Sequence, residues 1–121
     1  RSYSNVISVV YNGAVSAGVV YYQPGPISAL ADSYIIRLKN KELNEQLGLY
    51  LACALQKVTK AKYSRENKAV WKRVSEDYIE LPVVESGEPD WDYMVDYIGK
   101  LELEYIDEFE VYINDMRRLG G

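Results

Sequence analysis

The sequence contains no histidine and a single cysteine, Cys53, among its 121 residues. Without histidine, the chain has no imidazole general base and none of the common histidine metal sites. The single thiol cannot close a disulfide within the chain, and the apolar run around it, LYLACAL, predicts a buried side chain. No apolar stretch approaches the eighteen or so residues of a membrane span. We therefore expect no cofactor, and no residue pattern supports catalysis.

A secretory signal and the common phosphate-binding loops are also missing. Arg1 to Val10 has no charged start, long apolar run or small-residue cleavage site, so we expect a cytoplasmic protein. No GxGxxG or Walker pattern occurs, so neither Gly13 nor Gly18 is predicted to hold a nucleotide phosphate. The acids of PDWDYMVD lack the glycine and terminal glutamate of a calcium loop, and helix capping explains them. We expect no metal site here.

What the sequence does contain is a sharp internal charge polarity. Lys57–Arg73 carries seven basic residues and one acid, Glu66, a local net charge of +6. From Val74 to the end there are fourteen acids and three bases, a net of −11, whereas residues 1–56 are close to neutral. The basic stretch has tyrosine, serine and asparagine between its charges, which suits phosphate and base contacts. A positive patch that is simply solvated is the alternative interpretation.

The first forty residues predict β structure. Asn5–Tyr11 and Gly18–Gln23 are rich in β-branched and aromatic residues, and Asn12-Gly13 between them is a strong turn signal. Ile27–Lys39 contains one or two further strands after the break at QPGP. We predict a β-meander.

The pattern changes to helix at Asn40. Apolar residues recur every three or four positions from Lys41, which predicts an amphipathic helix of about 18 residues with Asn40 as its N-cap. Tyr63–Lys68 is predicted to be a loop, Ala69–Val74 a short helical turn, and Asp77–Pro82 a strand closed by proline.

A long helix is predicted after the turn at Glu85–Pro89, with Asp90 as its N-cap. Its apolar stripe has a mean step of about 3.6 residues over about 26 residues. The stripe consists of Trp91, Met94, Ile98, Leu101, Tyr105, Phe109, Tyr112 and Met116. Because helices in compact domains average about 11–12 residues, we expect this one to project or to form coiled-coil contacts with another helix.

These elements predict an α/β (α+β) fold: a small, mostly antiparallel sheet, a packed helix and a long C-terminal helix. Hydrophobic residues make up 48% of the chain, which is enough for the core of one domain. We assign residues 1–84 to that domain and residues 85–121 to a linker and an assembly helix.

Two runs, KYSRENKAVWKRVSEDYIELPV and GEPDWDYMVDYIGKLE, resemble the DNA-specificity domain of restriction–modification systems. They are similar to the specificity (S) subunits of type I enzymes, in which a target recognition domain ends on a strand with a Leu-Pro pair, here Leu81-Pro82. The run GVVYYQPGPISALADSYIIRLK, with Asp32 at an acidic position, resembles the family's strands. A full recognition domain has more β structure before Asn5, so the chain resembles the C-terminal part of one.

The resemblance implies a non-catalytic component that recognises double-stranded DNA sequence. In the family, loops of the recognition domain read bases, while long helices act as spacers that bind methyltransferase subunits. The expected partners are double-stranded DNA and a methyltransferase subunit, with a nuclease subunit and self-association through the C-terminal helix as further options. Methyl transfer and cleavage belong to those partners.

The same resemblance places the DNA contacts in the basic stretch. The side chains expected to hold phosphates are Lys60, Lys62, Arg65, Lys68 and Lys72. Those expected to reach base edges are Tyr63, Ser64 and Asn67, with Asn67 suited to adenine.

A protein-interaction module is the competing hypothesis. In that interpretation the long helix is the active element, and the basic patch matches acids on a neighbouring chain. The residues of the expected partner interface are Trp91, Ile98, Leu101, Tyr105, Phe109 and Tyr112.

Overall fold

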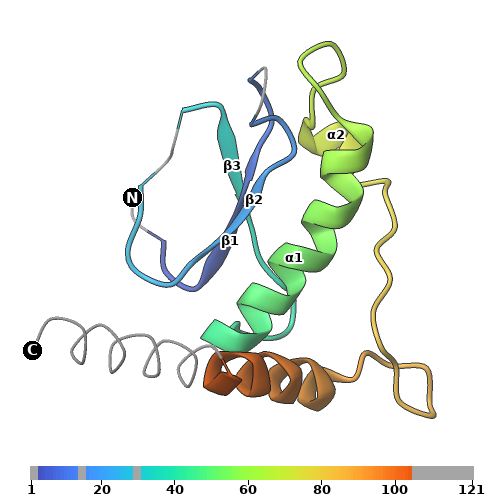
Figure 1. The fold of residues 1–121 in the computed structure, drawn as a ribbon. Coiled ribbons are helices and arrows are strands. Elements are labelled where there is room, and N and C mark those ends of the chain that lie inside the picture. Colours follow the sequence, from blue (N-terminus) through green and yellow to red (C-terminus); the bar gives the residue numbers. More distant parts are fainter. Residues whose placement is uncertain (1–2, 14–15, 29–30, 105–121) are drawn as a thin grey trace, which may run out of the picture.

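The computed structural model describes residues 3–13, 16–28 and 31–104 (Figure 1). A three-stranded sheet packs against a long helix, and a second helical segment crosses the end of that layer, so the α+β class is confirmed. The labelled elements are β1 (Val6–Val10), β2 (Val20–Gln23), β3 (Ser33–Ile36), α1 (Glu45–Lys62) and α2 (Trp71–Val74). Residues 91–104 are also helical.

The sheet is antiparallel, but its strand order is β2-β1-β3 and not that of a meander. β1 is the central strand, with Ser8 opposite Tyr21 on one side and Ile35 on the other. The chain leaves β2 through Pro24 and Pro26, which lack the N–H groups that a neighbouring strand needs. The strand that follows, β3, pairs with the other edge of β1.

The helix predicted from Lys41 has the expected length of 18 residues but begins later, at Glu45. Asn40 is not its cap, because the Oδ1 atom of Asn44 accepts the backbone N–H of Leu47 at 2.8 Å. Leu43, which the apolar pattern assigned to the helix, is buried from the preceding loop. The apolar pattern of the sequence thus does not distinguish a buried side chain in a loop from one in a helix.

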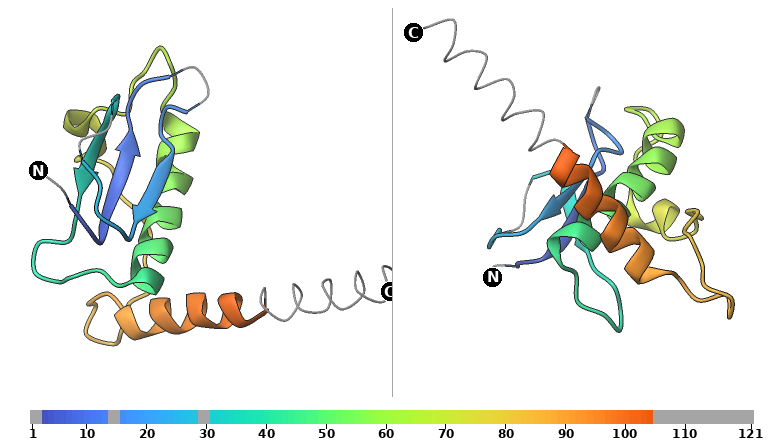
Figure 2. Two further views of the ribbon diagram at one scale, coloured as in Figure 1. Left: turned by 90° about the vertical axis from the view of Figure 1, so that its left-hand side faces the viewer. Right: turned by 60° about the horizontal axis from the view of Figure 1, so that its bottom comes forward.

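The buried face of α1 covers one face of the sheet (Figures 1 and 2). Leu47, Leu51 and Leu55 form a single core with Ile7 and Val9 of β1. This face excludes Cys53, which is exposed, contrary to the prediction of a buried thiol. At about 100° per residue, Cys53 lies two residues and about 200° from Leu51, on the opposite side of the helix.

Two close approaches hold α1 on β2 and on the turn before it. A Cβ atom at Gly48 would lie 2.2 Å from the ring of Tyr22, so only glycine allows this helix–strand distance. The buried hydroxyl of Thr59 donates to the carbonyl oxygen of Gly18, and the side chain of Gln56 accepts the N–H of Val20 at 2.9 Å. These contacts position the C-terminal half of α1.

The strand predicted at Asp77–Pro82 is not formed among the described residues. This segment runs along α1 on the side away from the sheet (Figure 1), so no strand lies beside it. One isolated antiparallel bridge, Val83 with Pro89, closes the following turn. Alternation in DYIELP instead reflects Ile79 and Leu81, which pack on the core while Tyr78 is exposed.

The helix of residues 91–104 begins at the predicted cap, since the Oδ1 atom of Asp90 accepts the N–H of Tyr93 at 3.0 Å. It lies across the N-terminal end of α1 (Figure 2). Met94 is fully buried in the core that α1 and the sheet share, and Ile98 is 9% exposed. The predicted continuation to Met116 lies outside the described residues. Within the described ranges, no helix has the length and apolarity needed to span a bilayer.

Candidate nucleic-acid interface

The basic stretch gathers at one end of the molecule. It consists of the last turns of α1, a loop of residues 63–70, and α2 (Figure 1, green to yellow). The helix of residues 91–104, which carries the acids Asp92 and Asp96, lies at the other end of α1 (Figures 1 and 2). The fold thus places these two acids away from the basic stretch, whereas Asp77 forms an ion pair with Lys62.

The loop is anchored to the sheet at Ala69, which has no exposed surface. The N–H of Ala69 donates to the carbonyl oxygen of Tyr11 at 3.1 Å, and its carbonyl oxygen accepts the hydroxyl of Tyr34 at 2.7 Å. Burial, with smaller contributions from the charges of Tyr63 and Asp77, raises the pKa of Tyr34 well above its usual value. The hydroxyl therefore stays protonated and keeps this anchor.

The rest of the loop is folded by its own hydrogen bonds. The N–H of Ser64 donates to the carbonyl oxygen of Asn67 at 2.9 Å, and the N–H of Asn67 donates to Ser64 Oγ at 3.3 Å. From α2, the guanidinium of Arg73 donates to Asn67 Oδ1 at 2.8 Å and to the carbonyl oxygen of Lys68 at 3.2 Å. The exposed residues of the loop are therefore held in a defined arrangement before any ligand binds.

Asp77 ties the start of the loop to the segment that follows α2. Its carboxylate, 5% exposed, accepts hydrogen bonds from the ammonium of Lys62 and the hydroxyl of Tyr63. Burial raises the pKa of Asp77, but these hydrogen bonds and the charge of Lys62 outweigh burial, and the pKa is lowered from its usual 3.8. The hydrogen bond to Asp77 is also the main cause that raises the pKa of Lys62 above 10.5.

We predict that Asp77→Asn destabilises the protein by about 1 kcal/mol at neutral pH, because a charged acceptor becomes a neutral one. The native carboxylate has a lowered pKa, so its contribution is full above pH 3.8 and is lost as the pH falls below that value. Chemical unfolding of both proteins at pH 7 and pH 3 tests this. A stability gap that is equally large at both pH values would contradict it.

The residues expected to bind phosphates differ in whether their charge is already paired within the protein. Arg65, Lys68 and Lys72 are exposed, and within the described part of the chain none of the three forms an ion pair. Lys60 is also exposed. The side chain of Lys62 is 55% exposed while it pairs with Asp77.

The three residues expected to reach base edges are in different environments. Tyr63 is 5% exposed and belongs to the core, whereas Ser64 and Asn67 are exposed in the turn. The amide of Asn67 accepts from Arg73 and donates to the carbonyl oxygen of Lys62 at 3.3 Å. An amide has two N–H donors and two acceptor lone pairs. Counting the contacts of the described residues, Asn67 therefore keeps one N–H and one lone pair for a ligand.

Residues 4–110 match the family described as type I restriction modification DNA specificity domain. The chain belongs to this family. It is also 31% identical, over 98 residues, to the specificity subunit S.BcgI of the type II restriction enzyme BgcI from Heyndrickxia coagulans. That match covers 81% of this chain but 28% of the relative, so the chain spans little more than a quarter of the relative's length. No solved structure gave a significant match.

Sequence reasoning missed several residues that shape the specificity domain's basic loop. Arg73 was counted only as a charge, although it folds the loop, and Asp77 was assigned to a strand, although it fixes Tyr63. Tyr34 anchors Ala69 from 35 residues away. The high tyrosine content predicts half-buried rings whose hydroxyls form hydrogen bonds, but it does not identify which group accepts each bond.

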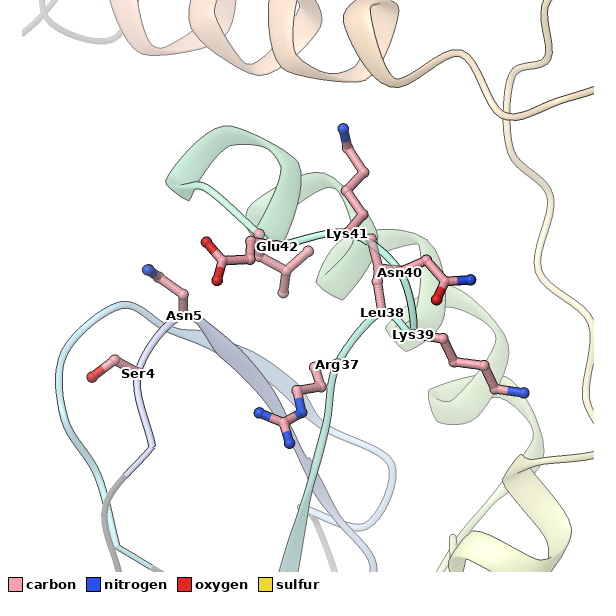
Figure 3. A pocket seen from close by; sticks show the side chains of 9 residues that line it. Ser4, Asn5, Arg37, Leu38, Lys39, Asn40, Lys41 and Glu42 are labelled. Atoms are coloured by element: carbon pink, nitrogen blue, oxygen red, sulfur yellow. The ribbon is translucent and has the colours of Figure 1, made fainter.

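A second group of cations lies near the N-terminal end of α1, on the loop between β3 and α1. A cavity of about 480 Å³ is lined there by Arg37 and Glu42 together with Ser4 and Asn5. Figure 3 shows Arg37 directed toward the Asn5 side and Lys39 pointing away from it.

In the part of the chain that the structure describes, no group of three or more acidic, cysteine or histidine side chains is placed to hold a metal ion.

The residues expected at a partner interface divide between core and surface. Ile98 is buried within the specificity domain itself, and Trp91 and Leu101 are partly buried. Tyr105, Phe109 and Tyr112 lie outside the described residues. An open groove beside this helix is lined by Tyr50, Tyr78, Tyr93, Tyr97, Leu81 and Leu101. Tyr93 and Tyr97 are exposed, whereas Met94 of the same helix is buried.

Proposed function

We propose that this chain takes part in sequence-specific recognition of double-stranded DNA as the specificity component of a restriction–modification complex. The observation that carries the proposal is the set of exposed cations held on a hydrogen-bonded loop at one end of the domain. Membership of the specificity-domain family supports it. Duplex DNA carries one negative charge per about 1.7 Å of axis, which matches a compact patch of exposed cations.

Phosphate binding is assigned first to Arg65, Lys68 and Lys72, whose charges are not matched by acids among the described residues. Lys60 and Lys62 flank them on the last turns of α1. Contacts of this kind fix the position of a protein on the duplex but carry no sequence information. Recognition needs side chains that reach the bases from the same platform.

Base reading is assigned to Ser64 and Asn67. Both are exposed, and the bonds to Arg73 and within the turn limit their movement, so little entropy is lost when they bind. The remaining donor and acceptor of Asn67 match the N7 acceptor and N6 amino group of adenine. Tyr63 acts from the core by positioning the loop through Asp77.

Catalysis is assigned to partner subunits, with a methyltransferase subunit and a nuclease subunit as the proposed ones. Their contact surface would include the helix of residues 91–104, which lies at the end of the molecule away from the basic loop (Figure 1). Exposed Tyr93 and Tyr97, whose rings stack at 6.2 Å, are suited to such an interface. DNA and partner could then bind without competing for one surface.

The salt dependence of duplex binding tests this proposal. Phosphate contacts by three to five of these cations predict that log K falls with log salt at a slope of about −3 to −4.5. Fluorescence anisotropy of a labelled random duplex, measured from low to physiological salt, gives this slope, and a single strand of equal length serves as the control. No duplex binding at low salt, or equal affinity for both DNA forms, would overturn the proposal.

A further inference from the structure

Trp71 is an exposed aromatic side chain that belongs to none of the contacts assigned above. It is the first residue of α2, and 53% of it is exposed. Its ring meets Tyr34 edge-on at 6.0 Å and 65°, and Tyr34 in turn stacks on Tyr11 at 6.3 Å and 21°. Three aromatic rings thus form a column from the end of β1 through β3 to the surface at α2.

The column holds Trp71 firmly while leaving half of it in water. The hydroxyl of Tyr34 is fixed on Ala69, so the support of the indole ring is part of the anchor of the loop. Tryptophan is among the residues most enriched at binding surfaces. Lys72 and Arg73 follow Trp71 directly, and Lys68 precedes it by three residues, so its surroundings are cationic.

Cations around an exposed indole suggest a ligand that combines negative charge with flat apolar groups. Duplex DNA offers both, because its phosphates flank base pairs that present thymine methyl groups in the major groove and, where a base step is unstacked, base faces. The second tryptophan, Trp91, differs: it is partly buried, and Lys41 lies over its ring at 5.6 Å. Trp71 therefore has the more accessible ring, and it is the one beside the basic loop.

We propose that Trp71 contacts the DNA bases as an apolar group and contributes to sequence preference. This inference rests on the proposed function and adds a residue to the same interface. The cations around it hold phosphates, and the indole ring packs on a thymine methyl group or on the face of a partly unstacked base. Because this contact is apolar, it releases no counterions, and its loss leaves the salt slope unchanged.

Trp71→Ala and Trp71→Phe test the role against a cationic neighbour. We expect Trp71→Ala to weaken binding to a preferred duplex about tenfold at an unchanged salt slope, with Trp71→Phe recovering most of the loss. Lys72→Ala should instead weaken binding to all duplexes and lower the slope by about one. Wild-type affinity and sequence preference in Trp71→Ala would overturn the inference, as would a lowered slope.

Tryptophan fluorescence separates this inference from the proposed function. Wild-type emission should change when duplex DNA binds, whereas Trp71→Phe, in which Trp91 is the only tryptophan, should show little change. An equal change in both proteins, with binding intact, would refute the role of Trp71 while leaving DNA recognition in place. Near-ultraviolet circular dichroism of each variant shows whether its fold is retained.

Discussion

The double charge reversal Lys68→Glu with Lys72→Glu is expected to weaken duplex binding on the order of a hundredfold at low salt. Both side chains are exposed, and neither forms an ion pair within the described ranges, so their loss disturbs little of the fold. Two lost contacts should also lower the salt slope by about two. Anisotropy titrations at several salt concentrations measure both effects.

A matched control reverses the same number of charges elsewhere. Lys39 and Lys100 are exposed and lie outside the basic stretch, one on the loop before α1 and one on the helix of residues 91–104. The variant with Lys39→Glu and Lys100→Glu has the same net charge as the first double variant. If both variants lose affinity equally, net charge and not the basic loop governs binding, and the assigned interface is wrong.

Gly18→Ala is expected to cost about 3 kcal/mol of folding free energy, a loss on the order of 10 °C in melting temperature. Gly18 has a φ of +85°, and a Cβ atom there would lie 2.7 Å from the backbone oxygen of Thr59. Because that neighbour is backbone in α1, the turn cannot relax without moving the helix. The bond from Thr59 Oγ1 to the carbonyl oxygen of Gly18 would be lost with it.

Gly99→Ala is expected to raise the melting temperature in the same assay. Gly99 lies in the helix of residues 91–104, and a Cβ atom there meets nothing within 4 Å. Alanine should therefore stabilise this helix by about 0.5–1 kcal/mol. Thermal unfolding of both variants tests the pair, and a melting temperature of Gly18→Ala at or above that of wild type would refute the proposed close approach.

The local structure of this chain was largely predictable, because periodicity and capping act over a few residues. The strands around Val9 and Tyr21, the loop after Lys62 and the cap at Asp90 all follow from such signals. The order of the strands did not follow, since proline at 24 and 26 shows that β2 ends but not where β3 pairs. The cap at Asn44 was missed because Leu43 is buried from a loop.

The sequence predicted where the basic residues of the candidate site lie along the chain, but not how their side chains are arranged. Seven bases in Lys57–Arg73 locate a surface, yet the sequence does not show which of them are exposed. Tyr63 has charged neighbours in the sequence and is nevertheless buried. Its ring packs in the core, and its hydroxyl donates a hydrogen bond to the carboxylate of Asp77. Long-range contacts, such as Tyr34 with Ala69, decide the arrangement, and no local pattern encodes them.

Selection from a random duplex pool tests the central claim most directly. The chain is mixed at physiological salt with duplexes that carry a randomised segment, and the bound fraction is sequenced over several rounds. Our account predicts that one sequence motif is enriched and that Lys68→Glu with Lys72→Glu abolishes the enrichment. A bound fraction as random as the input pool would show that this chain does not read DNA sequence.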